Sequence, residues 1–187
     1  MIESYINDHI KVLEQIRDYN EKEIQGIVSL FLHTIYNNNR IYFIGNGGSA
    51  ADSQHLAAEF SGKHLSKKPL SAVALTSDTS VITAISNDYS FEDVFAIQIE
   101  AHVNRNDLVI ALSTSGDSLN IVNGVKMARE LGAKVVGLTG MNGGRLAPLC
   151  DNTIIVPSNH IGHIQESHII IGHLIYELVC KELLNEA

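Results

Sequence analysis

Two groups of polar side chains have types and spacing that could do chemistry. His55 and Glu59 are four residues apart, directly after the stretch GNGGS, so on a helix they would project from the same face. Far downstream, the segment HIGHIQESHIIIGH holds four histidines and also carries Gln165. Its last residue, His173, is surrounded by apolar residues, and a polar group in such surroundings needs a partner. Glu59 or a metal ion could be that partner.

Imidazole, carboxylate and amide oxygen form a donor set that suits a borderline metal ion, and zinc is the ion we expect. On one straight helix, Gln165 and His173 would be about 12 Å apart along the axis and roughly 80° apart in direction. One ion could join both only at full stretch, unless the helix begins irregularly. We therefore expect a site that subunits share. The histidines at 9, 33, 64 and 102 are interpreted as surface or satisfied groups.

Two loops of small residues, GNGGS and STSGDS, each follow an expected strand and lead directly into an expected helix. The first N–H groups of a helix lack internal partners, so such loops can bind anions. Helix capping, by Ser49 with Asp52 in the first loop and by Ser118 in the second, is the alternative interpretation. Capping does not explain the run 113–115, which is Ser-Thr-Ser, and we expect this run to bind a phosphate monoester.

Nucleotide sites are disfavoured by the same two loops. STSGDS lacks the lysine of the GxxxxGK[ST] motif, which argues against a nucleoside triphosphate. Gly45, Gly47 and Ala50 satisfy a loose GxGxxA fingerprint for dinucleotides. No acidic residue follows at the expected distance, since Asp78 comes late, so a nicotinamide cofactor is not expected.

The elements that must position these residues alternate along the chain. Short apolar runs at 40–46, 71–75, 107–113, 134–140 and 152–158 predict strands, and 49–62, 80–103, 118–132 and 161–184 predict helices between and after them. This order predicts an α/β fold: a doubly wound, five-stranded parallel sheet flanked by helices. Two further helices, with a break near Tyr19 and Asn20, form an N-terminal helical extension, 1–38, before the main domain, 39–187. Ligands should sit where Gly45, Ser113 and Ser158 open loops at the carboxyl ends of strands.

Composition excludes several classes of function. The formal net charge of the 187 residues is −8, so the protein has no positive electrostatic field that would attract the phosphate backbone of nucleic acid. The cationic clump Lys63, Lys67 and Lys68 is interpreted as a solvated loop, with a functional role as the alternative.

The cysteines and the apolar runs bear on the compartment. Cys150 and Cys180 are expected to be buried thiols in a reducing compartment. With no long apolar run and no signal peptide, a cytoplasmic protein without a membrane span is expected.

The chain resembles the sedoheptulose 7-phosphate isomerases, or phosphoheptose isomerases, of the sugar-isomerase (SIS) domain superfamily. Four ordered segments carry the resemblance: GNGGSAADSQHLAAEFSGK, ALTSDTSVITAISNDYSFEDVF, ALSTSGDSLNIV and VPSNHIGHIQESHIIIGHLIYELV. It implies a homotetramer with active sites at subunit interfaces. Such an enzyme interconverts sedoheptulose 7-phosphate and D-glycero-D-manno-heptose 7-phosphate, which feeds lipopolysaccharide or other surface glycans.

The resemblance also implies site residues. Zinc ligands, with one ion per subunit, fall on His55, Glu59, Gln165 and His173. Substrate contacts fall on Asn46, Gly47, Gly48, Ser49, Asn87, Asp88, Ser113, Thr114, Ser115, Ser118 and Gln165. For proton transfer through an enediol, Glu59 is the expected base and His173 the expected acid. Whether the metal is catalytic or structural stays open.

The last motif departs from the family, because Ile161 and His163 stand where a threonine and an arginine are usual. This leaves the sugar more open than the reaction type. Two alternatives therefore remain: an isomerase for another sugar phosphate, and a non-catalytic SIS tetramer that binds a partner protein, as in replication-initiation regulators.

Overall fold

The computed structural model describes residues 1–62, 65 and 69–185. The expected lysine clump and His64 lie outside this part of the chain. A single sheet has the strand order β2-β1-β3-β4-β5, with every neighbouring pair parallel. The strands are β1 (Ile41–Gly45), β2 (Ala72–Ala74), β3 (Leu108–Ser113), β4 (Lys134–Gly140) and β5 (Asn152–Val156). The predicted five-stranded, doubly wound sheet is thus confirmed.

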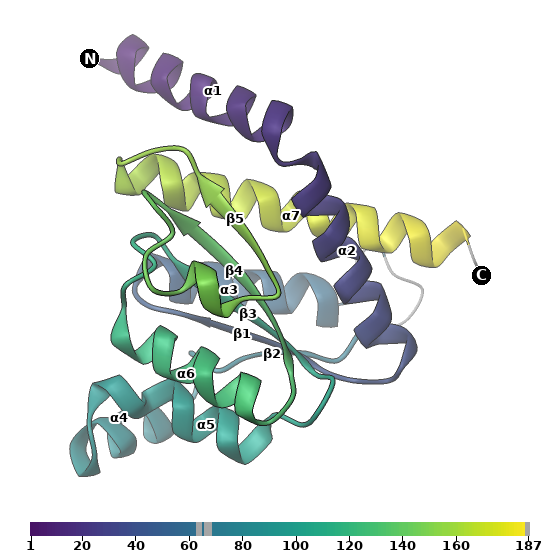
Figure 1. Ribbon diagram of the computed structural model, residues 1–187, viewed down its shortest axis with the longest axis vertical. Coiled ribbons are helices and arrows are strands. Elements are labelled where there is room, and N and C mark those ends of the chain that lie inside the picture. Colours follow the sequence, from purple (N-terminus) through teal and green to yellow (C-terminus); the bar gives the residue numbers. More distant parts are fainter. Residues whose placement is uncertain (63–64, 66–68, 186–187) are drawn as a thin grey trace.

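Helices cover both faces of the sheet (Figure 1). One face packs against α2 (Glu21–Tyr36), α3 (Gly48–Ser61) and α7 (Ile161–Asn185). The other face packs against α4 (Thr79–Asp88), α5 (Val94–His102) and α6 (Leu119–Glu130). Short 3-10 turns lie at η1 (Phe91–Asp93) and η2 (Ala147–Leu149). Because both faces are covered, the central strands β1 and β3 are buried along their whole length.

One expected helix is wrong in its extent. The segment 80–103 is divided between α4, η1 and α5. The break comes at Ser90, whose hydroxyl accepts a hydrogen bond from the Glu92 N–H at 3.1 Å and donates one to Asp93 at 2.7 Å. A serine that bonds the following backbone in this way favours a new helix start over continuation of the old one.

The N-terminal extension forms the two expected helices, α1 (Ile2–Tyr19) and α2, with the break at Asn20. Helix α2 contributes Ile27 and Phe31 to the core, whereas α1 projects beyond the sheet towards the N-terminus (Figure 1). Apolar side chains of α1 are left exposed, namely Ile2, Ile6 and Ile10. No described helix is long and apolar enough to cross a membrane.

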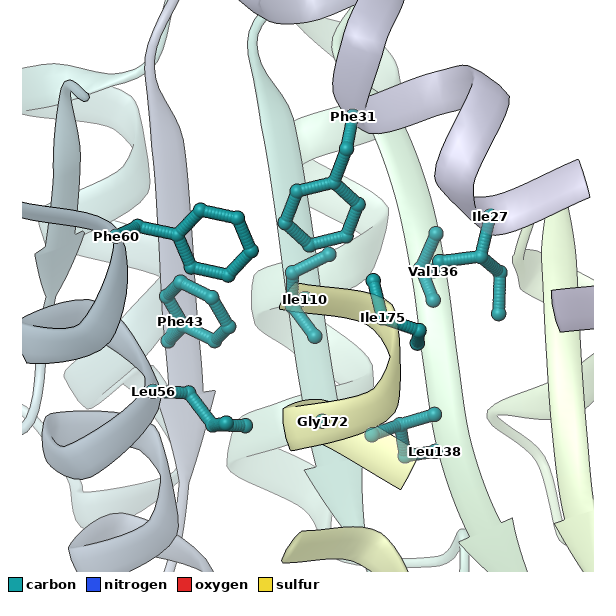
Figure 2. A pocket seen from close by; sticks show the side chains of 10 residues that line it. All are labelled: Ile27, Phe31, Phe43, Leu56, Phe60, Ile110, Val136, Leu138, Gly172 and Ile175. Atoms are coloured by element: carbon teal, nitrogen blue, oxygen red, sulfur yellow. The ribbon is translucent and has the colours of Figure 1, made fainter. Parts of the chain in front are cut away.

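Helices α3 and α7 pack closely over one part of the core. Phe31 stacks on Phe60 with ring centroids 4.9 Å apart, and the apolar side chains around them point toward one another (Figure 2). They leave a void of only about 10 Å³. At the centre of the contact, a Cβ on Gly172 would lie 2.5 Å from a methyl carbon of Leu56. A side chain at 172 would therefore force the Leu56 side chain out of its present position in this closely packed contact.

Candidate functional site

The close approach of α3 and α7 places two histidines in contact. His55 precedes Leu56 and His173 follows Gly172, so the residues that flank this close contact face each other. The Nε2 atoms of the two imidazoles are 2.8 Å apart. Glu59, one turn further along α3, brings its Oε1 to 3.6 Å from the His55 Nε2. Residues more than a hundred positions apart in sequence thus form one cluster.

The cluster of His55, Glu59 and His173 is open to solvent on one side. His55 is exposed, and the other two side chains are half-buried. The expectation that His173 is buried among apolar residues is therefore wrong. Successive residues of an α-helix are about 100° apart. The flanking Ile171 and Ile175 point into the core, which turns His173 toward the edge of α3.

The cluster fits a metal ion by donor type and by spacing. One ligand atom from each of the three residues lies within 4.8 Å of the others. Two imidazole nitrogens and one carboxylate oxygen match the ligand types found in zinc sites with an open position. The 2.8 Å contact between the rings also requires that at least one Nε2 be an unprotonated acceptor. An unprotonated imidazole nitrogen is the form that binds a metal.

Gln165, the fourth expected ligand, lies elsewhere on α7. A Cβ on Gly48 would collide with the Gln165 amide, so this side chain packs against the first residue of α3. The eight-residue spacing puts Gln165 about 12 Å from His173 along the helix axis. Within one protomer, Gln165 therefore contacts the glycine loop, and the other three expected ligands cluster further along the two helices.

Asp52 lines a pocket that was not predicted from the sequence. It lines an open pocket of about 320 Å³ with Gly162, Gln165 and Glu166. Its Oδ2 is buried without a hydrogen-bond partner in the described chain, and burial raises the pKa of this carboxyl. The only signal in the sequence was its position three residues before His55, on the same helical face. The alternative interpretation, in which Asp52 joins Ser49 in capping α3, is wrong, because the N-cap residue is Gly47 and no side chain caps it.

The two small-residue loops meet at the carboxyl edge of the sheet. Strands β1 and β3 are neighbours in register, with Gly45 paired to Leu112, and the strand order reverses between them. Asn46 and Asn120 join the loops by two reciprocal amide hydrogen bonds, each 2.8 Å. This is the crevice where open α/β sheets bind ligands.

Helix capping does not account for the serines of these loops. Helix α3 begins at Gly48 with Gly47 at its N-cap, so Ser49 lies inside the helix and is buried. Ser118 does occupy the N-cap of α6, but it makes no side-chain capping hydrogen bond. Asp78, too late for a dinucleotide site, caps α4 by accepting from the Val81 N–H at 3.0 Å. The capping interpretation is therefore wrong for Ser49, whereas for Ser118 the N-cap position is confirmed and the side-chain hydrogen bond is absent.

The hydroxyls of STSGDS instead organise the loop itself. The buried Ser113 Oγ accepts from the Gly116 N–H at 3.2 Å and lies 3.4 Å from the Ser118 Oγ. Ser115 Oγ accepts from the Asp117 N–H at 3.2 Å. Thr114, Ser115 and Ser118 remain partly exposed. The loop is therefore internally braced while it presents hydroxyls outward.

Two expected substrate residues are not brought to this crevice by any contact that the structure records. Asn87 and Asp88 close α4, are exposed, and bond each other at 2.8 Å between the Asn87 Nδ2 and the Asp88 Oδ1. Helix α4 covers the face of the sheet opposite α3 and α7 (Figure 1).

His163, which replaces the usual arginine, points into a contact between α1 and α7. Its ring stacks on His9 at 4.9 Å between centroids, and it is buried. Glu166 accepts from the Tyr5 hydroxyl at 3.1 Å and lies 3.0 Å from the His9 Nδ1. His9 is thus a satisfied histidine, as expected. The departure at His163 supports helix packing and does not line the crevice.

His168 is fully buried and bonded to strand β4, outside the three-residue cluster. Its Nε2 lies 3.0 Å from the Thr139 carbonyl oxygen, which can only accept, so this nitrogen carries the proton. Burial lowers the pKa of His168 to about 4, and the ring is therefore neutral. The thiols also play no part: Cys180 is buried, and burial raises the pKa of Cys150 to about 11. Cys150 is only partly buried, which corrects the expectation of full burial.

Comparisons with known proteins identify the family and agree with the fold. The SIS domain family model matches residues 4–140. A phosphoheptose isomerase of Aliarcobacter butzleri is 43% identical over 176 residues, which cover 94% of this chain and 93% of that protein. The solved phosphoheptose isomerase of Neisseria gonorrhoeae superposes with a TM-score of 0.91 at 36% identity, covering 95% of this chain and 96% of its own. That of Francisella tularensis gives 0.93 at 33% identity, covering 96% of each chain.

Proposed function

The chain belongs to the phosphoheptose isomerase family of SIS-domain proteins, and from this premise we propose that it interconverts sedoheptulose 7-phosphate and D-glycero-D-manno-heptose 7-phosphate. The observation that carries the proposal is the meeting of His55, Glu59 and His173 between two helices, one of which starts at the small-residue crevice. An aldose–ketose isomerisation needs a base at carbon and an acid near the oxygens. The cluster supplies a carboxylate and two imidazoles for these roles.

In the proposed mechanism, the phosphate binds at STSGDS through Thr114, Ser115 and Ser118, with Ser113 bracing the loop. Binding of the phosphate away from the reacting carbons orients C1 and C2 and lowers the entropic part of the barrier. Further proposed substrate contacts are Asn46, Gly47, Gly48, Ser49, Asn87, Asp88 and Gln165. Of these, the Asn46 amide is paired with Asn120, so it would act mainly by holding the two loops together.

Glu59 removes a proton from C1 of the ketose, which gives the enediol, and a proton returned at C2 gives the aldose. A ring nitrogen of His173 that holds no metal exchanges a proton with the substrate oxygens, and in the metal-free cluster the contact with His55 orients the ring. We propose that His55, Glu59 and His173 hold one zinc ion, with Gln165 as a fourth ligand. A bound zinc would polarise the carbonyl and favour negative charge on the neighbouring oxygens.

We further propose a homotetramer whose active sites combine residues of neighbouring protomers. Support comes from uncovered apolar surface on α1 and α7, including Ile6, Ile10 and Leu174, since contiguous exposed apolar patches mark interfaces. An intersubunit arrangement would also bring Gln165 and Asp88 of one copy toward the cluster of another. A cytoplasmic location and a role in heptose supply for surface glycans complete the proposal.

The proposed function is tested by incubating the zinc-loaded protein with sedoheptulose 7-phosphate and following heptose 7-phosphate in a coupled assay. We expect kcat/KM at least about tenfold higher for this ketose than for pentose or hexosamine phosphates, because contacts to missing carbons and hydroxyls are lost. A higher kcat/KM for a shorter sugar phosphate would make that sugar phosphate the proposed substrate instead. No turnover of any ketose or aldose phosphate would refute an isomerase.

A further inference from the structure

A second loop packs directly against the expected phosphate loop. Residues 141–146 follow β4, and the loop 113–118 begins at the last residue of the neighbouring strand β3. The Leu146 N–H donates to the Gly116 carbonyl oxygen at 2.9 Å. Gly116 has φ +69°, and a Cβ there would collide with the Gly143 carbonyl. The two backbones therefore touch with no room for a side chain between them, and the shape of one loop depends on the other.

One residue fastens this contact. Arg145 donates its backbone N–H to Asp117 Oδ1 at 3.1 Å and its Nε–H to the same oxygen at 3.0 Å. An NH2 group of its guanidinium donates to the Asp117 carbonyl oxygen at 2.6 Å. The Arg145 hydrogen bond holds the pKa of Asp117 below its usual value, so this carboxylate is ionised at neutral pH. Both side chains are about half exposed, and such pairs add little to stability.

The charge of Asp117 is a problem for phosphate binding. The segment STSGDS holds no lysine or arginine, so its single ionised side chain has the same sign as the ligand. Like charges at one site disfavour binding, and a cation within hydrogen-bond distance offsets them. Arg145 supplies that cation, and it comes from a loop that the sequence motif does not include.

We propose that Arg145 is a positioning residue for the phosphate site: it fixes loop 113–118 against loop 141–146 and cancels the charge of Asp117. The proposal rests on the assignment of STSGDS as the phosphate loop. Arg145 acts through Asp117 and need not touch the substrate. It should therefore affect KM for a phosphorylated substrate much more than kcat.

The experiment compares wild type with Arg145→Met, Arg145→Lys, Arg145→Met/Asp117→Asn and a matched control, Arg129→Met. Arg129→Met also removes a hydrogen bond to a backbone carbonyl, because Arg129 donates to the Leu149 carbonyl oxygen at 2.8 Å. Arg129, however, lies on an exposed face of α6. We expect Arg145→Met to raise KM for sedoheptulose 7-phosphate about tenfold, with kcat within about twofold. KM of Arg145→Lys should lie between those of wild type and Arg145→Met. KM of Arg145→Met/Asp117→Asn should be lower than that of Arg145→Met, because the uncompensated charge of Asp117 is removed.

Binding of inorganic phosphate, measured by calorimetry, provides a readout without turnover. Weaker phosphate binding by Arg145→Met, with Arg129→Met unchanged, would support the proposal even if the wild type fails to isomerise sedoheptulose 7-phosphate. In that case only the proposed function would fail. Equal phosphate affinity and equal KM in wild type and Arg145→Met would overturn the role of Arg145. An equal loss in Arg129→Met would overturn it as well.

Discussion

Replacement of Glu59 by glutamine is expected to lower kcat for the isomerisation by at least about a thousandfold. Glutamine keeps the size of the side chain but cannot take a proton from carbon, and a positioned general base contributes roughly 10² to 10⁴ in rate. Glu59 is half-buried beside His55 at 3.6 Å, so its removal also affects the orientation of that ring. The coupled assay for heptose 7-phosphate measures the loss.

Glu177→Gln is the matched control for this variant. Glu177 lies one turn after His173 on the exposed side of α7, so the control makes the same chemical change outside the cluster. We expect wild-type kcat from it. Similar values of kcat for Glu59→Gln and Glu177→Gln would show that Glu59 is not the base in the isomerisation. A melting temperature near that of the wild type would show that Glu59→Gln is folded.

Replacement of His173 by alanine is expected to weaken zinc binding at least about a hundredfold. Changes to groups that merely orient ligands already cost 10- to 100-fold, and loss of a direct ligand should cost at least as much. Competitive titration of the metal-free protein with a zinc indicator gives the affinity. His55→Ala should behave in the same way, because its Nε2 lies 2.8 Å from that of His173.

His102→Ala controls for the loss of any histidine. His102 ends α5, is exposed, and lies outside the three-residue cluster. We expect unchanged zinc affinity from it. One zinc per subunit in wild type, with equal affinity in His173→Ala, would place the metal elsewhere.

Gln165→Ala tests whether the Gln165 amide is a fourth ligand. Because Gln165 and His173 are about 12 Å apart along the axis of α7, the amide would come from a neighbouring copy of the chain.

Sequence patterns were sufficient for the architecture because the signals are local. Buried parallel strands such as 108–113 are continuous apolar runs, and Asn20 separates two amphipathic helices at the expected place. The break near Ser90 was missed because it depends on a side chain that bonds the next turn, while the apolar spacing continues across it. Helix α3 also starts one residue before Ser49, where glycines replace a cap.

The site could be predicted only in part, because its contacts are long-range. His55 and Glu59 share a helical face by spacing alone. Their meeting with His173 depends on the fit of Leu56 against Gly172, which no local pattern reveals. The spacing of Gln165 and His173 predicts a site shared between subunits, and this stays a prediction. Asp117 and Arg145 meet only because their strands are neighbours in the sheet.

Isomerisation in D₂O, followed by proton NMR on wild type and Glu59→Gln, tests the central claim most directly. If the cluster of His55, Glu59 and His173 moves a proton through an enediol, heptose 7-phosphate formed by the wild type carries deuterium at C2 at equilibrium. Glu59→Gln should form neither the heptose nor the label on the same time scale. Unlabelled heptose from the wild type, or labelled heptose from the variant at the wild-type rate, would contradict the account.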